Sequence, residues 1–154
     1  MATSAVPGAI AALLDILRSP PIDNVSVLDG PPTDDIQTQD LIVIGWSAEG
    51  DQAATFTQDW NAAGARTRDE TVGISGWIDV WSGDTGFTAV RARAFELLGE
   101  VEQRIRATGP NPTAPTLNGA VLWAELSVGQ LYQSHADQGI RAALGFTVSC
   151  HARI

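Results

Sequence analysis

The closing stretch of the chain, residues 139–154, decides the fold, and it reads GIRAALGFTVSCHARI. Every second side chain from Ala142 to Ile154 is apolar, and most positions between them are polar or charged. Successive side chains of a β-strand point to opposite faces of its sheet, so this pattern predicts a strand with one face in the core. The alternation runs unbroken for thirteen residues, from Arg141 to Arg153.

The sequence before this strand predicts its partners in a sheet. Val121–Tyr132 is typical of a second long strand, with Gln133–Gln138 as the tip of the hairpin between them. Arg66–Trp81 alternates as well, which predicts a third strand. Gly73 and Gly76 inside it indicate a bulge, a bend or the close approach of another backbone.

Two shorter apolar runs lie nearer the N-terminus. Val25–Leu28 predicts a short strand, which the turn residues Asp29-Gly30-Pro31-Pro32 end. Leu41–Ile44 is continuously apolar and predicts a strand covered on both faces. The next segment, Ser47–Gly64, shows no clean period and is predicted to be a long loop.

Two segments have helical periodicity. In the first, Ser4 is a candidate N-cap and Pro7 lies in the first turn, before apolar residues at helical spacing as far as Leu17. The second spans Phe87–Ile105, with Asp84 or Thr85 as its cap and Glu–Arg pairs four residues apart on its outer side. We therefore expect one α+β domain over residues 1–154. It would have a mostly antiparallel sheet of four to five strands, with two helices packed on one face.

The composition limits the classes of function. The 154 residues are 44% apolar and 18% charged, which is typical of a folded globular protein. The formal net charge of −9 opposes tight binding to nucleic acid, because the average surface repels phosphate. No stretch approaches the length of a membrane span and no signal peptide is recognisable, so we expect no membrane partner.

No catalytic or cofactor motif is present in the sequence. The best enzymatic pair is Cys150 with His151, helped by His135 or Asp137. Adjacent strand residues face opposite sides, however, which favours a core cysteine and a surface histidine. The carboxylate pair Asp69-Glu70 is more typical of solvated surface than of acid–base catalysis. We expect no enzyme activity, no cofactor and no metal.

The tryptophans are the most informative side chains. Trp77 and Trp81 share the face of the third strand opposite its aliphatic residues, and Trp46 follows the strand at Leu41–Ile44. Aromatic residues on the second face of a sheet are enriched in protein interfaces. The alternative is that a loop or the N-terminal segment covers these rings within the monomer.

The succession of elements resembles the tail terminator and minor tail protein family of long-tailed bacteriophages. The resemblance lies in the opening helix, in Val25–Pro32, in Leu41–Trp46 with its acidic loop, in the helix Phe87–Ile105 and in the closing Ala143–Arg153. It implies a virion subunit, assembled in the host cytoplasm, that forms a homo-hexameric ring on the head-proximal end of the tail tube. Such a ring stops tube polymerisation and meets a head-side connector or neck protein, while genomic DNA passes through it without tight binding.

The resemblance also implies that the segment Ser47–Gly64 and its flanking strands contact the tube or neighbouring subunits. Eight residues are the candidate assembly interface: Trp46, Trp60, Trp77, Trp81, Arg66, Arg68, Asp69 and Glu70. Within the same class, a head-completion protein or a tail tube subunit is the alternative. A small binding module or a Cys/His enzyme is a remoter one.

Overall fold

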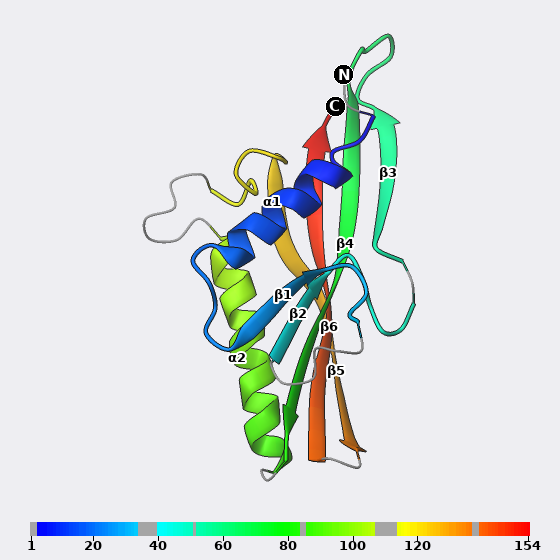
Figure 1. Cartoon of the computed structure of the whole chain (residues 1–154). Helices are drawn as coiled ribbons and strands as arrows, with labels where there is room; N and C mark the ends of the chain where they lie inside the picture. Colours follow the sequence, from blue (N-terminus) through cyan, green and yellow to red (C-terminus); the bar gives the residue numbers. More distant parts are fainter. Residues whose placement is uncertain (1–2, 34–39, 51, 84–85, 107–113, 137–138) are drawn as a thin grey trace.

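The computed structural model describes residues 3–33, 40–50, 52–83, 86–106, 114–136 and 139–154. These residues form an α+β fold of two helices and six strands (Figure 1). The elements are α1 (Val6–Arg18), β1 (Val25–Asp29), β2 (Asp40–Ile44), β3 (Ala54–Trp60), β4 (Arg68–Ser82), α2 (Phe87–Ile105), β5 (Trp123–Ala136) and β6 (Gly139–Arg153).

The antiparallel pair β4–β6 forms the middle of the sheet. Its register is continuous from Asp69 opposite Arg153 to Ser82 opposite Ile140. The strand order is β1-β2-β4-β6-β5, and β3 pairs with the first half of β4, beyond the end of β2. Both strands that the sequence predicts most clearly are therefore confirmed, and they are neighbours.

The sheet differs from the prediction in strand number and direction. It has six strands instead of four to five, and it is mixed because β1 and β2 run parallel. Val25, the first residue of β1, lies opposite Asp40, the first residue of β2. Pro31 and Pro32 follow β1 and have no N–H to donate, so they cannot extend its ladder.

The predicted long loop at Ser47–Gly64 is wrong, because Ala54–Trp60 is strand β3. Thr55, Phe56 and Trp60 have the propensity for a strand. None of the side chains of β3 is buried, so the segment has no alternation between a core face and a solvent face. The two-residue alternation that identifies a half-buried strand is therefore absent from β3.

The hairpin tip predicted at Gln133–Gln138 is also too long, since β5 and β6 pair as far as Ala136 opposite Gly139. The register of β4 with β6 is continuous through Gly73 and Gly76, so these glycines mark the close approach of a neighbouring residue and not a bulge. The described register shift of the sheet lies instead in the β5–β6 pair, between Leu126 and Val128. A Cβ built on Gly76 would lie 2.2 Å from Cζ of Phe146 on β6. The Phe146 ring thus occupies the space that a side chain at Gly76 would need.

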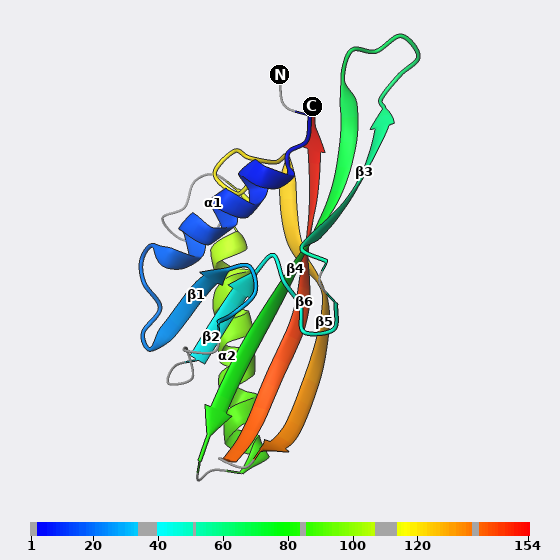
Figure 2. The same cartoon turned by 45° about the vertical axis from the view of Figure 1, so that its right-hand side comes forward.

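Both helices pack on one face of the sheet, as predicted, and enclose the main core with it (Figure 2). α1 buries Leu13, Leu14 and Leu17. α2 buries a stripe with helical spacing: Val90, Ala94, Leu97, Val101 and Ile105. On its outer side, Glu100 pairs with Arg104 at 2.8 Å and Glu102 pairs with Arg106, as the sequence predicts.

The helix caps differ from the prediction. Ala5 is the N-cap of α1, and the hydroxyl of Ser4 accepts a hydrogen bond from the Val6 N–H at 3.1 Å. Asp84 and Thr85 lie outside the described residues, and Gly86 is the N-cap of α2.

Substituting Gly76→Ala is expected to lower the free energy of unfolding by about 1–3 kcal/mol, because the new methyl group overlaps the Phe146 ring. The double variant Gly76→Ala/Phe146→Leu should lose less than the two single variants together. Urea unfolding followed by circular dichroism measures both. Simple additivity would show that the two residues are not in contact.

Candidate assembly interface

The hairpin of residues 54–74, which we call the arm, diverges from the helix side of the molecule (Figure 2). It contains β3, the turn at 61–67 and the first half of β4. Among the described residues β3 pairs with β4 alone, so the outer edge of β3 has no strand neighbour. Phe56 is 54% exposed and Trp60 is 65% exposed. The register with Val72 places both on the core-side face, beyond the cover of the helices.

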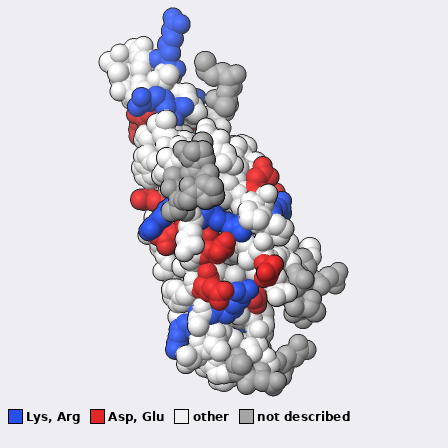
Figure 3. Space-filling view, turned by 90° about the vertical axis from the view of Figure 1, so that its left-hand side faces the viewer, with Lys and Arg blue, Asp and Glu red and all other residues white. Residues whose placement is uncertain are grey.

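The end of the arm is basic. Residues 60–68 hold Arg66 and Arg68 and no acidic residue, although the whole chain carries a net charge of −9. The Arg68 guanidinium lies 5.7 Å from the centroid of the Trp60 ring, and it donates to Oε1 of Gln58 at 2.8 Å. In Figure 3 the outermost atoms at this end of the molecule are basic. The arm thus presents aromatic and cationic groups together.

Glu70 fastens the base of the arm to the N-terminal segment. Its carboxylate is fully buried, and it accepts hydrogen bonds from the Ala5 N–H at 2.7 Å and from Nε2 of Gln58 at 2.5 Å. Gln58 also donates to the carbonyl of Thr3 at 2.8 Å. We call this set of contacts the Glu70 clamp. The prediction that Glu70 lies on the solvated surface is wrong, because its carboxylate is buried against the N-terminus of α1.

The electrostatics of the clamp favour ionised Glu70. Burial by itself raises the pKa of the carboxyl. The hydrogen bonds from Gln58, Ala5 and Ser4, and the nearby Arg68, together hold the pKa of Glu70 below its usual value. The positive end of the α1 dipole acts in the same direction. Glu70 is therefore a structural anion and has the opposite pKa shift from a general acid.

Asp69 lies on the other face of β4. Arg153 donates to its carboxylate at 2.8 Å and holds the pKa of Asp69 below its ordinary value. The imidazole Nε2 of His151 lies 4.0 Å from the same carboxylate, and its ring stacks on Trp123 with centroids 5.9 Å apart. These groups are partly exposed, unlike Glu70.

Trp77 is part of a second, smaller core on the face opposite the helices. It is only 4% exposed, and it packs with Val43 and Ala143. Tyr132 stacks on it at 5.5 Å, and Trp46 meets it edge-on at 6.2 Å. For Trp77 the monomer itself supplies the cover, which is the alternative that the sequence left open.

Trp81 is 44% exposed at the far end of β4 from the arm. Arg141 places its guanidinium 5.3 Å from the Trp81 ring centroid and forms a two-bond ion pair with Asp79 at 2.8 and 2.5 Å. The fifteen residues of β4 span roughly 45 Å, so Trp81 and the arm are widely separated. The eight candidate residues therefore do not form one patch.

Sequence reasoning missed several exposed apolar residues. Besides Phe56 on the arm, they are Phe95 on α2 and a group on or just before β5: Leu122, Trp123, Val128 and Leu131. The sequence predicts strand β5, but the position of β5 at the free edge of the sheet follows only from the strand order. A sequence pattern cannot distinguish an edge strand from a central one when its apolar residues are equally frequent.

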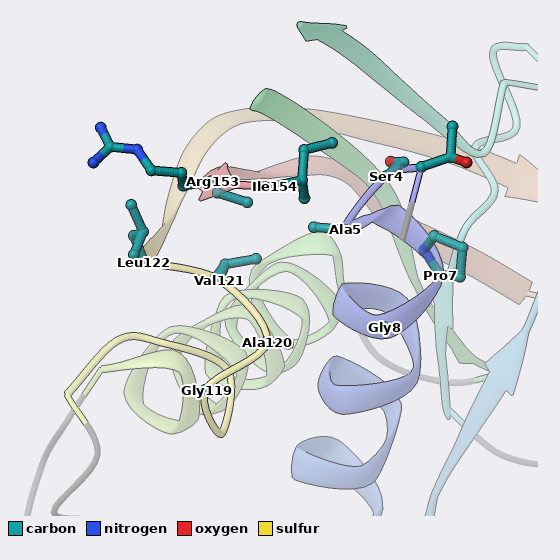
Figure 4. A pocket seen from close by; sticks show the side chains of 12 residues that line it. Ser4, Ala5, Pro7, Gly8, Gly119, Ala120, Val121, Leu122, Arg153 and Ile154 are labelled. Atoms are coloured by element: carbon teal, nitrogen blue, oxygen red, sulfur yellow. The ribbon is translucent and has the colours of Figure 1, made fainter. Parts of the chain in front are cut away.

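An apolar groove of about 670 Å³ lies on the helix side of the sheet, next to the base of the arm (Figure 4). Its walls are the start of α1 with the segment before it, the turn at 119–122 and the end of β6. A Cβ built on Gly8 or Gly119 would meet nothing within 4 Å, so both walls are open there. Beyond the turn, a second hollow of about 400 Å³ is lined by Glu102, Trp123 and Glu125.

Cys150 and His151 are on opposite faces of β6, as predicted. Cys150 is buried in the main core, where desolvation raises the pKa of its thiol to about 11. His135 lies against Phe87, with ring centroids 5.0 Å apart, and Asp137 is outside the described residues. Among the described residues, no group of three His, Cys, Asp or Glu side chains could hold a metal ion.

The chain matches no protein-family model and no curated protein sequence. In the described part of the chain, no helix is long and apolar enough to cross a membrane.

Trp77→Ala and Trp81→Ala are expected to differ sharply in stability. Trp77→Ala removes the middle of a buried cluster and should lower the free energy of unfolding by about 3–5 kcal/mol. Trp81→Ala removes an exposed ring and should cost less than about 1 kcal/mol. Urea titrations give both values, and equal losses would contradict the assignment of Trp77 to a core.

Glu70→Gln should lower the free energy of unfolding by about 1–3 kcal/mol at pH 7, because Ala5 and Gln58 donate to different oxygens of the carboxylate and the amide would place an NH2 donor against one of them. Since the folded-state pKa of Glu70 is lowered, its stabilisation is present above the ordinary glutamate pKa of 4.5 and is lost as the pH falls through the folded-state pKa. The difference between the two proteins should therefore shrink in acid.

The matched control for this pH dependence is Glu96→Gln, whose side chain is 69% exposed on α2. It should change stability by less than about 0.5 kcal/mol at any pH. The stability of the wild type, Glu70→Gln and Glu96→Gln is measured by thermal unfolding between neutral pH and pH 3. A Glu70→Gln deficit that persists unchanged in acid would contradict the ionised clamp.

Proposed function

We propose that this chain is a structural virion protein, the tail terminator of a long-tailed bacteriophage. It forms a ring that caps the tail tube, stops its polymerisation and provides the surface for joining the head. Its partners are further copies of itself, the tail tube protein and a head-side neck protein. The order of elements along the chain supports the family, and the surface of the subunit supports ring formation.

The observation that carries the proposal is the pair of unlike surfaces on opposite lateral sides of one sheet. One side carries the arm, with exposed Phe56 and Trp60, and the other carries the β5 edge, with exposed Leu122 and Trp123. Rings arise from head-to-tail contacts between two different surfaces of the same subunit. A single exposed patch would instead favour a two-fold dimer.

The charge of the chain suits a ring that DNA crosses. A net charge of −9 disfavours phosphate contacts that would hold the DNA in place. On the helix side, acidic and basic groups lie side by side (Figure 3), and Arg93 is paired with Asp40 and Glu96. Arg104 and Arg106 are paired with carboxylates as well, and this pairing weakens their attraction for a phosphate backbone.

A tail tube subunit is the second candidate, because the chain has more strand than the sequence predicts. A head-completion protein of the neck is the third. Both are virion proteins that assemble from many copies, so the three candidates differ in the defect that their loss produces.

The experiment is deletion of the gene from its parent phage, followed by measurement of tail length by negative-stain electron microscopy. Overlong, headless tails beside filled heads are expected, because uncapped tubes continue to grow. The same deletion complemented by the wild-type gene in trans is the control, and it should restore tail length.

The other outcomes assign the chain elsewhere. Absence of tails would identify a tube subunit. Tails of normal length with unjoined or leaking heads would identify a neck protein. Normal virions would contradict a structural role altogether.

A further inference from the structure

We propose that neighbouring subunits join their sheets edge to edge, with β3 of one subunit added antiparallel to β5 of the next and Phe56 beside Leu131. The occupant of the β5 edge is thus one strand of a second copy of this chain. The inference rests on the proposed ring-forming function and names the contact that would close the ring, which we call the sheet joint.

The first argument is that two edges of the sheet are open. The sheet ends at β1, at β3 and at β5. Arg18 donates to the Val27 carbonyl at 2.9 and 3.2 Å and thereby occupies an acceptor of the short strand β1. In the described part of the chain, β3 has no strand neighbour besides β4, and β5 has none besides β6. Open edges present unpaired N–H and C=O groups to which another chain can add a strand.

The β5 edge also lacks the devices that commonly keep an edge strand from pairing. Residues 126–134 read LSVGQLYQS, with no charged residue and no proline. Exposed edges are usually guarded by lysine, by proline or by an inward-pointing charge. Residues 54–58 of β3 have no charge and no proline either. The two strands can therefore pair without like charges opposite each other.

Helix α2 adds an exposed aromatic ring to the β5 edge. Phe87 lies against His135 with ring centroids 5.0 Å apart, and Arg91 donates to Oε1 of Gln133 at 2.9 Å. This flank of α2 therefore faces β5. Phe95 is one turn further along the same flank, and it is 48% exposed.

The exposed apolar residues of the two edges lie on the same face of the sheet. Leu131 is opposite Leu144 of the main core, so its side chain is on the helix side, where it is 38% exposed. Phe56 is on the helix side as well. Because a joined sheet keeps its faces continuous, a neighbouring β3 brings Phe56 against Leu131 and Phe95. Such aromatic and aliphatic pairs across strands stabilise a sheet.

The strand directions suit a head-to-tail joint. β3 is antiparallel to β4, β4 to β6, and β6 to β5. Within one subunit β3 and β5 therefore run in opposite directions. Where the sheet continues into the next subunit, the neighbouring β3 meets β5 antiparallel, which is the more stable pairing.

The register follows from the part of β5 that is free. Phe56 is level with Ala124, because Phe56 is opposite Val72, Val72 is opposite Cys150, and Cys150 is opposite Ala124. The N–H of Ala124 already donates to the Pro115 carbonyl at 2.6 Å. A neighbouring β3 must therefore pair further along β5.

An offset to Leu131 agrees with the geometry of a closed ring of strands. Leu131 is opposite Leu144, six positions along β6 from Cys150. Six residues rise about 20 Å, and four strands side by side span about 19 Å. The strands would thus be inclined by about 45° to the ring axis, close to the tilt of roughly 35–45° in closed barrels.

The same offset brings opposite charges together. Residues 61–67 follow β3, so an antiparallel joint places them beside the start of β5. This turn carries the exposed Arg66 and no acidic residue. The hollow of about 400 Å³ at the start of β5 contains Glu102 and Glu125, and Glu125 has no ion-pair partner among the described residues.

A charge exchange across the sheet joint tests the proposal. Phe56→Glu and Leu131→Lys each place a charge on one edge, and both side chains are partly exposed, so the fold should be retained. Each single variant should weaken assembly about 30-fold or more, the effect of losing an interface anchor. The double variant Phe56→Glu/Leu131→Lys should recover to within about tenfold of the wild type, because the opposite charges meet across the joint.

The matched control is Ala92→Lys, which puts the same charge on an exposed position of α2 away from the flank that faces β5. It should assemble as the wild type does. Association of the purified full-length proteins is measured by native mass spectrometry and sedimentation. Circular dichroism verifies that each variant is folded.

Hydrogen exchange tests whether the joint is made by backbone pairing. Amides in residues 54–60 and 128–134 should exchange more slowly in wild-type rings than in the dissociated Phe56→Glu protein. Unchanged exchange in both segments on assembly would contradict strand addition, because new ladder hydrogen bonds protect the amides that form them.

The remaining outcomes separate the sheet joint from the proposed function. If Phe56→Glu assembles normally, or if mixing Leu131→Lys with Leu131→Glu restores assembly, β5 pairs with β5 and the sheet joint is wrong. If the double variant does not recover, the joint is wrong as well, and ring formation by the wild type stands. If the wild type stays monomeric at its highest soluble concentration, the joint is wrong and the tail-length phenotype decides the function by itself.

Discussion

The rest of the structure depends on the long antiparallel ladder between β4 and β6. It runs in continuous register from Asp69 opposite Arg153 to Ser82 opposite Ile140. One face of this ladder receives both helices and the other receives the small aromatic cluster around Trp77. Because β4 is longer than β2, its first half is free to pair with β3, and the arm arises from that excess length.

The sequence predicts those parts of the fold that are buried on one side and exposed on the other. The alternation in β4 and β6 and the stripe of α2 from Val90 to Ile105 have this property, and their bounds agree closely with the structure. β3 and the end of β5 are exposed on both faces, so no alternation of apolar and polar residues separates strand from loop there. The parallel β1–β2 pair was missed because two prolines after a strand mark its end and do not show where the chain goes next.

The candidate interface shows the same division. The sequence shows that the tryptophans are large apolar side chains that need cover, but it does not show which of them are covered within the monomer. Trp77 is enclosed by Trp46 and Tyr132, and Tyr132 comes from a strand 55 positions later in the sequence, a contact that only the tertiary structure creates. Glu70 is a similar case, because its partners Ala5 and Gln58 lie in a helix start and in a strand that the sequence did not predict.

The N-terminal segment of residues 3–5 belongs to two surfaces at once. Its backbone is held by Gln58 and Glu70 at the base of the arm, and the same residues form part of the wall of the groove. A substitution that reshapes the groove therefore also shifts the support of the arm on the same subunit. In the evolution of such a protein the arm and the groove are not free to drift separately, because a change in one alters the other through a single short piece of backbone.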